Sequence, residues 1–255
     1  MKVDIFFTPY EVNEENFKNH VAVVVDVLRA STTICAALSA GAKEIIPAES
    51  TSAAIQLAGN LSRDAILLCG EREGKLVEGF DLGNSPLQYT PALVRDRTLI
   101  FGSTNGSPAI VKTRLARYTL ICSLVNLDAV VQALSETDEP VVILCAGKIA
   151  QFAIEDAVCA GKVIHELQNR TGRDLELNDG ASAALILFDR YRDLIPSVVM
   201  DSHHGRYLSE IGMQADLPFC SDLNRIPLLP VYHDGKITLS ETKTLPAKDE
   251  RDKLK

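Results

Sequence analysis

The sequence has no tryptophan, and aromatic residues make up only 5% of its 255 residues. Surfaces that stack nucleic-acid bases need exposed aromatic rings, so this composition argues against them. Positive charge is also scarce, because 26 Lys and Arg stand against 34 Asp and Glu, for a formal net charge of −8. We therefore expect no nucleic-acid partner. An anionic ligand would need a local site made of a metal ion, a few arginines or backbone N–H groups.

Long apolar runs and clustered cysteines are missing too. No run of about 18 apolar residues occurs, so we expect no membrane-spanning helix. The first ten residues, MKVDIFFTPY, do not have the pattern of a signal peptide, because Asp4 interrupts their apolar stretch. The six cysteines are scattered in apolar segments without a CxxC or Cys/His pair. This pattern indicates buried free thiols in a reducing, cytoplasmic environment rather than a zinc site.

Short β-branched runs alternate with alanine-rich helical stretches as far as about residue 167. This alternation predicts an α/β fold with a buried, mostly parallel or mixed sheet. Strands are expected at 20–26, 43–48, 65–69, 97–101, 118–123 and 140–147, and helices at 31–40, 51–60, 105–115, 124–134, 152–167 and 181–191. Residues 1–240 are expected to form a single domain, followed by a charged tail at 241–255. The units 23–41 and 142–161 resemble each other, which fits either an internal βα duplication or chance.

Polar residues gather directly after the first of these strands. Asp26 ends the strand, and Arg29, Ser31, Thr32 and Thr33 follow at the start of a helix. A helix N-terminus with added hydroxyl and guanidinium donors suits a phosphate or sulfonate group. The same residues also suit an ordinary helix cap, and the segment alone does not decide between the two.

Two further segments follow strands and contain small and polar residues. The glycine-rich stretch 70–86 includes Glu71, Asp81 and Asn84, which would suit Mg²⁺ or, equally, a solvated turn. The stretch 102–108 includes Thr104, Asn105 and Gly106, where the backbone could approach a ligand or simply turn.

Two adjacent pairs complete the candidates. Glu155 and Asp156 stand early in a predicted helix. One of them could bind a metal ion, or both could be surface residues whose negative charges interact favourably with the positive end of the helix dipole. The pair His203–His204 is expected in a surface or supporting role. No GxSxG, HExxH or GxGxxG motif occurs. The Asp-x-Asp signature of haloacid-dehalogenase-type phosphatases is absent as well, since Leu28 stands at its second position.

Taken together, these segments resemble the 2-phosphosulfolactate phosphatase family. The matching pieces are DVLRASTTI from Asp26, GEREG from Gly70, GFDLGNSP from Gly79, TNG from Thr104, CAG from Cys145 and FAIEDAVCAG from Phe152, with looser matches at DGA from Asp179 and DLPFC from Asp216. One departure is STNGS at 103–107, where TTNGT is expected. Lys148 and Ala150 are others, near positions where the family tends to have glycine.

The resemblance implies a layered α/β/α enzyme that hydrolyses (2R)-2-phospho-3-sulfolactate to 3-sulfolactate and phosphate with Mg²⁺. In methanogens this step belongs to coenzyme M biosynthesis. Its partner would be a small anionic phosphorylated substrate, and the oligomeric state stays open, a homo-oligomer included. The alternative is a non-catalytic binder of a phosphorylated or sulfonated metabolite at the same helix N-termini.

The placement of the candidates after strands and in loops leads to specific expectations. Two or three of five carboxylates are expected to bind Mg²⁺ directly: Asp26, Glu71, Asp81, Glu155 and Asp156. The anionic groups are expected at Arg29, Ser31, Thr32, Thr33, Asn84, Thr104, Asn105 and Gly106. Catalysis is assigned to Asp26 and Arg29, with in-line attack by a water that the metal activates. An aspartyl-phosphate on Asp26 remains the open alternative.

Overall fold

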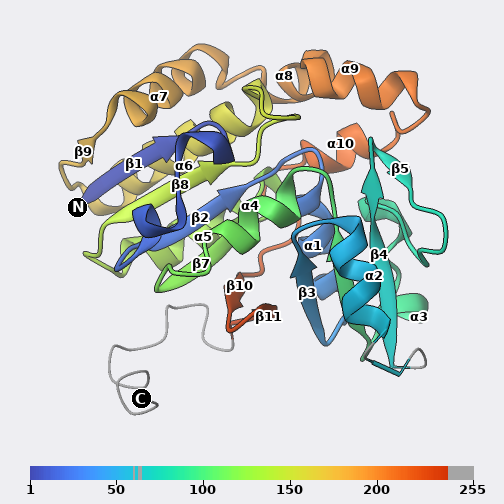
Figure 1. Ribbon diagram of the computed structural model, residues 1–255. Helices are drawn as coiled ribbons and strands as arrows, with labels where there is room; N and C mark the ends of the chain where they lie inside the picture. The colour runs from blue at the N-terminus through green and yellow to red at the C-terminus, as the bar shows by residue number, and fades with distance from the viewer. Residues whose placement is uncertain (60, 63–64, 241–255) are drawn as a thin grey trace, which may run out of the picture.

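The computed structural model describes residues 1–59, 61–62 and 65–240 (Figure 1). Within them, eleven strands form one sheet in the order β5-β4-β6-β3-β11-β10-β7-β2-β8-β1-β9. The strands are β1 (Lys2–Phe6), β2 (Val21–Val25), β3 (Glu44–Ala48), β4 (Ile66–Arg72), β5 (Lys75–Leu76), β6 (Thr98–Gly102), β7 (Tyr118–Cys122), β8 (Val141–Cys145), β9 (Glu176–Leu177), β10 (Pro230–His233) and β11 (Lys236–Leu239). The predicted layered α/β class with a mixed, mostly parallel sheet is confirmed.

The sheet has two parallel parts joined by a hairpin. Strands β7, β2, β8, β1 and β9 are parallel to one another, and so are β3, β6 and β4. The β10–β11 hairpin pairs antiparallel with β7 on one side and with β3 on the other. In Figure 1, β3 and β4 run crosswise to β1 and β8, and the carboxyl ends of β2 and β4 point toward the same region near α10. Ligands of parallel sheets bind beyond such strand ends.

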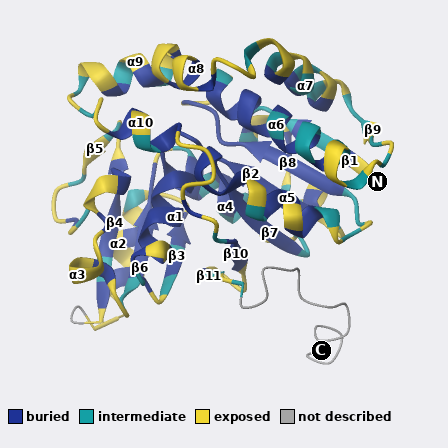
Figure 2. Cartoon of the chain, turned by 180° about the vertical axis from the view of Figure 1, so that it is seen from behind, coloured by how far each residue is buried: buried dark blue, intermediate teal, exposed yellow. Residues whose placement is uncertain are grey.

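Helices cover both faces of this sheet. They are α1 (Ala30–Ser39), α2 (Thr51–Gly59), α3 (Pro91–Val94), α4 (Gly106–Lys112), α5 (Leu127–Ser135), α6 (Ile154–Thr171), α7 (Asp179–Tyr191), α8 (Ile195–Asp201), α9 (His203–Glu210) and α10 (Asp216–Cys220). Val23 packs with the core under α5, α6 and α7, whereas its neighbour Val24 packs on the opposite face with α1 and α4. Burial on both faces explains why β2 is apolar throughout. Figure 2 shows the central strands buried and the exposed residues on the outer sides of the helices.

Helices α1 and α4 lie between the two parts of the sheet. One core cluster contains Ile34 of α1 and Ile110 of α4 together with Val24 of β2 and Leu99 of β6. Each of the two helices directly follows a strand, α1 after β2 and α4 after β6. The segments that precede these helices are therefore brought together from opposite parts of the sheet.

Most predicted elements are confirmed to within one or two residues. Several elements were not predicted: the alternating strand β1, the short strands β5 and β9, the β10–β11 hairpin, and the helices α3, α8, α9 and α10. All six cysteines are buried and free, as predicted, and burial raises the pKa of Cys69 to about 12. In the part of the chain that is described, no helix is both long and apolar enough to cross a membrane. The predicted tail at 241–255 lies outside the described residues. The single domain and the internal duplication stay predictions.

Candidate active site

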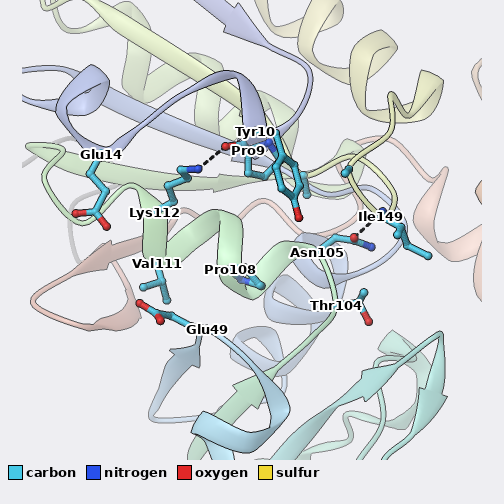
Figure 3. Close-up of a pocket in the computed structure, with 12 residues that line it drawn as sticks. Pro9, Tyr10, Glu14, Glu49, Thr104, Asn105, Pro108, Val111, Lys112 and Ile149 are labelled. Carbon is cyan, nitrogen blue, oxygen red and sulfur yellow. Dashed lines mark hydrogen bonds between the residues drawn. The ribbon is translucent and has the colours of Figure 1, made fainter.

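A pocket of about 310 Å³ lies where the segments after β2, β4, β6 and β8 meet helix α9. Its lining includes the predicted residues Asp26, Arg29, Glu71, Asn84, Thr104 and Asn105. A neighbouring pocket of about 470 Å³ shares Thr104, Asn105 and Ile149 with it. In that neighbour the Lys112 ammonium donates to the Pro9 carbonyl (Figure 3). We assign the candidate active site to the smaller pocket, because the buried acids and the arginine gather there.

Asp26 is buried at the end of β2, with 4% of its surface exposed. Its Oδ1 accepts a hydrogen bond from the Ala30 backbone N–H at 3.1 Å, at the first residue of α1. Burial raises the pKa of Asp26 from 3.8 to about 7, and the charges of Glu71 and Glu155 act in the same direction. The Ala30 hydrogen bond and the Arg29 charge oppose this rise. A carboxyl group with a pKa near neutrality can both accept and release a proton at the pH of the cell.

Gly106 makes room for this carboxylate. A Cβ atom added at Gly106 would lie 2.3 Å from Asp26 Oδ2 and 2.4 Å from the Cβ of Ala30. Any side chain at this position would displace Asp26 or α1. The sequence predicted Gly106 as a backbone contact for the ligand, whereas the structure shows that its lack of a side chain admits Asp26 beside the first turn of α4.

Glu71 joins two loops at the edge of the pocket. Its Oε1 accepts from the Thr104 N–H at 2.7 Å, and its Oε2 accepts from the Gly74 N–H at 2.6 Å and from the Thr104 hydroxyl at 3.1 Å. The Glu73 N–H in turn donates to the Thr104 hydroxyl at 3.3 Å. Glu71 and Thr104 therefore both line the pocket, but their polar atoms form hydrogen bonds that hold its wall together.

Arg29 also lines the pocket, yet its guanidinium is already paired. It donates to the carboxylate of Asp216 at 2.6 Å and to the Gly74 carbonyl at 2.7 Å. The Ser85 hydroxyl donates to the other oxygen of Asp216, also at 2.6 Å. Arg29 and Asp216 are 3% and 2% exposed, so this is a buried ion pair whose partners depend on each other. Part of the Arg29 charge is thereby neutralised inside the protein.

The acidic pair at the start of α6 lies behind the pocket. Asp156 accepts from the Val27 N–H at 2.8 Å and from the Gly147 N–H at 3.1 Å, so it ties the end of β2 to the turn after β8. Burial raises the pKa of Asp156 well above 3.8, and the charges of Glu155 and Asp26 add to this rise. Glu155 is buried, and its Oε1 lies 3.7 Å from Nδ1 of His204. Glu155 thus raises the pKa of Asp26 through its charge, and Asp26 in turn raises the pKa of Asp156.

The three hydroxyl residues after Arg29 do not face the pocket, which corrects their expected role. The Ser31 hydroxyl donates to the Val24 carbonyl at 3.4 Å. The Thr32 hydroxyl donates to the Val27 carbonyl at 2.8 Å, and that of Thr33 to the Asn84 carbonyl at 2.9 Å. All three are fully buried, because α1 is enclosed by both parts of the sheet. Their donors satisfy neighbouring carbonyl groups rather than a ligand.

Asp81 likewise lies apart from the other predicted metal ligands. Its side chain is exposed, it does not line the pocket, and its Oδ2 accepts from the Leu68 N–H at 2.8 Å. The carboxylate thus fixes the turn that follows β4. We therefore leave Asp81 out of the proposed metal site.

The two predicted asparagines have different environments. Asn105 Oδ1 accepts from the Ile149 N–H at 2.8 Å, in the wall that the two pockets share (Figure 3). Asn84 is 6% exposed and lines the active-site pocket. Its Oδ1 is buried and, among the described residues, has no hydrogen-bond partner. A buried acceptor without a partner is costly, which indicates that a ligand, ion or water satisfies it.

Several lining residues were not predicted as site residues. The Lys148 ammonium lies 4.1 Å from the centre of the Tyr207 ring. The Tyr207 hydroxyl donates to the Glu73 carbonyl at 2.9 Å. His203 and His204, noted in the sequence only for a supporting role, both line the pocket from the start of α9. The adjacent histidines were the one signal in the sequence that pointed to this helix.

No complete metal site is preformed in the described ranges. They contain no group of three or more His, Cys, Asp or Glu side chains placed to hold a metal ion. Mg²⁺ does not need such a group, because it usually binds one or two carboxylates and takes its other ligands from water and substrate phosphate. Asp26 and the unpartnered oxygen of Asn84 line one pocket and supply hard oxygen donors. The residues therefore fit a weakly preorganised magnesium site.

Comparison with known proteins identifies the family. A model of the family described as 2-phosphosulpholactate phosphatase matches residues 6–235. A protein of Symbiobacterium thermophilum named probable 2-phosphosulfolactate phosphatase is 42% identical over 89% of this chain and 97% of its own. Proteins of the same name from Caldanaerobacter subterraneus and Clostridium acetobutylicum are 35% and 37% identical, each over 93% of this chain and at least 99% of their own.

These matches define the class of protein as a phosphoric monoester hydrolase. The chain belongs to the 2-phosphosulpholactate phosphatase family, as its motifs predicted.

Proposed function

We propose that this protein is a Mg²⁺-dependent phosphatase that hydrolyses (2R)-2-phospho-3-sulfolactate to 3-sulfolactate and inorganic phosphate. The observation that carries the proposal is Asp26, a buried carboxyl group with a pKa of about 7 beside Arg29 in the pocket of a family member. In the cell we place this reaction in the cytoplasm, in the formation of sulfolactate or of coenzyme M.

Asp26 is the residue best suited to handle the proton of the attacking water. Without a metal ion its pKa is about 7, and the charge of a bound Mg²⁺ would lower that pKa, so Asp26 is available in its ionised form near neutral pH. The ionised carboxylate accepts a proton from water as the water oxygen bonds to phosphorus and the bond to the C2 oxygen of sulfolactate breaks. Asp216 and the Gly74 carbonyl hold the guanidinium of Arg29 in place. Its remaining N–H groups donate hydrogen bonds to the phosphate oxygens.

Magnesium would be held by Asp26 and Asn84, together with water and the substrate phosphate. When bound, the ion offsets the phosphate charge and lowers the pKa of a coordinated water. The electrostatics of the pocket support a cation here. Glu71 and Glu155 raise the pKa of Asp26, and a nearby positive charge relieves that repulsion.

The first experiment measures phosphate release from 2-phospho-3-sulfolactate, 2-phospholactate and 3-phosphoglycerate, each with Mg²⁺ and with EDTA. We expect turnover of the sulfonated substrate, and a loss of activity in EDTA that Mg²⁺ restores. Tight binding of the three compounds without phosphate release would instead identify a non-catalytic binder.

The course of the reaction at phosphorus separates the two mechanisms that the sequence left open. A substrate whose phosphate is chiral through oxygen isotopes reports the number of displacements. Direct attack by water inverts the centre, and we expect inversion. Retention would mean a covalent phosphoenzyme, with Asp26 as its nucleophile.

A further inference from the structure

A tight hairpin after β8 carries a lysine into the active-site pocket. Lys148 and Gln151 exchange two backbone hydrogen bonds, at 2.9 and 3.0 Å, around Ile149 and Ala150. Both central residues have positive φ angles, 48° and 64°. Two-residue hairpin turns of this geometry normally contain Asn-Gly, and a β-branched residue at positive φ is a true outlier. Such strain persists only where the surroundings fix it.

The surroundings do fix this hairpin. The Gly147 N–H donates to Asp156, and the Ile149 N–H donates to Asn105 across the wall of the pocket. A Cβ atom at Gly147 would lie 2.4 Å from the Gln151 carbonyl oxygen, so the chain passes too closely for a side chain there. The backbone on either side of Lys148 is therefore held by contacts with α6 and with the segment before α4.

The side chain of Lys148 is held as well, but its charge is not neutralised. Lys148 is 9% exposed and lines the pocket, and its ammonium rests over the Tyr207 ring. Glu155 and Glu210 act on it only through longer-range charge, and no acidic side chain of the described residues forms an ion pair with it. Arg29, by contrast, is paired with Asp216 at 2.6 Å. Lys148 is thus a buried cation available to an anion in the pocket.

Lys148 and Asp26 enter the pocket from different walls. The Asp26 carboxylate lies at the starts of α1 and α4, where it accepts from the Ala30 N–H and occupies the space beside Gly106. The Lys148 ammonium lies instead against Tyr207 of α9. A substrate whose phosphorus lies by Asp26 can therefore direct another of its anionic groups toward the ammonium.

We propose that Lys148 binds the sulfonate of the substrate and so sets the preference for sulfonated 2-phospho acids; this assignment rests on the proposed function. A sulfonate carries one negative charge at any physiological pH and offers three acceptor oxygens. An ammonium held over an aromatic ring matches it as a point charge with several donors.

The test compares Lys148→Met with the unmodified enzyme on two substrates, 2-phospho-3-sulfolactate and 2-phospholactate, which lacks the sulfonate. Hydrogen bonds to charged groups contribute about 1.5–3 kcal/mol, so the ratio of kcat/KM between the two substrates should fall by roughly 10- to 150-fold. The loss should appear mainly in KM. Lys148→Arg should keep most of the preference. Lys18→Met, which removes an exposed lysine that does not line the pocket, is the matched control.

Two results would overturn the assignment. An equal loss on both substrates would mean that Lys148 contacts the phosphate or the carboxylate, and an unchanged ratio would mean that it contacts no anion. Thermal unfolding of each variant shows whether it is folded, and Lys148→Gln replaces the methionine variant if that one is not.

Failure of the proposed function is separable from failure of this assignment. If the unmodified enzyme hydrolyses neither substrate, calorimetric titration with 3-sulfolactate and with lactate still tests Lys148. Preferential binding of sulfolactate that the Lys148→Met variant loses, by about tenfold or more, supports the sulfonate site. Equal binding of sulfolactate by the two proteins contradicts it.

Discussion

Replacement of Asp26 by asparagine should make the metal-free protein more stable at pH 8 while it abolishes activity. The exchange keeps the oxygen that accepts from the Ala30 N–H, because asparagine has an acceptor at Oδ1. It removes a negative charge that is fully buried and that Glu71 and Glu155 repel. Function and stability should therefore change in opposite directions, as expected where an active site stores unfavourable charge.

The magnitude follows from the pKa of Asp26, which rises from 3.8 in the unfolded chain to about 7 in the folded protein. The folded state binds the proton more tightly, so the stabilisation from protonated Asp26 is fully present below about pH 3.8 and is lost as the pH rises through about 7. At about 1.4 kcal/mol per pKa unit, the loss amounts to about 4 kcal/mol at most. Asp156 acts in the same direction, so the variant should reduce this pH dependence and not abolish it.

Urea unfolding in EDTA at pH 5, 6, 7 and 8 measures this effect, with Asp174→Asn as a control at an exposed carboxylate. We expect the free energy of unfolding to fall with pH more steeply for the unmodified protein than for Asp26→Asn, so that the difference is largest at pH 8. A variant that is less stable at pH 8, or that has the same pH slope, would refute the account of Asp26. Added Mg²⁺ should stabilise the unmodified protein at pH 8 and leave the variant nearly unchanged.

Two further substitutions test the geometry around this carboxylate. Gly106→Ala places a methyl group where Asp26 and Ala30 now lie. We expect the free energy of urea unfolding to fall by about 1–3 kcal/mol and kcat to fall at least tenfold. Native values for both would show that the start of α4 moves to accept the methyl group at little cost. The Arg29 guanidinium donates to both Asp216 and the Gly74 carbonyl, and the ammonium of Arg29→Lys cannot reproduce this planar arrangement. We expect kcat/KM to fall by about tenfold or more. Unchanged kinetics in that variant would exclude an anion contact by Arg29.

The strands that sequence analysis predicted are those buried on both faces. Runs such as Val21–Val25 are apolar at every position because helices cover both sides, and this leaves a clear signal. Strand β1 has an alternating pattern and was missed for that reason. The β10–β11 hairpin is short and joins the sheet through only a few pairs, so little in its sequence marks it as the link between the two parallel parts.

Because the β10–β11 hairpin was not predicted, the hydroxyl residues of α1 were assigned to the ligand. A helix that starts after a parallel strand commonly presents its first turn to a ligand, and Thr32 and Thr33 have suitable donors. Here the second part of the sheet folds against α1, and buried carbonyl groups use those donors instead. Asp26 and Glu71 both line the pocket because both stand at the carboxyl ends of strands, whichever way the two parts are joined, and their roles toward metal and substrate stay predictions.

The sequence does not indicate which charged side chains form ion pairs in the folded protein. Arg29 stands beside Asp26 in the chain and was therefore expected to serve the anion, yet a carboxylate 187 residues away, Asp216, neutralises much of it. Lys148 was noted in the sequence only as a departure from the family pattern, yet the fold buries its ammonium over Tyr207, and no acidic side chain of the described residues forms an ion pair with it. A sequence states which charges a protein has, whereas the tertiary structure decides which of them are already paired. In a protein with a net charge of −8, we expect the preference for a substrate with several negative charges to depend on unpaired cations such as Lys148.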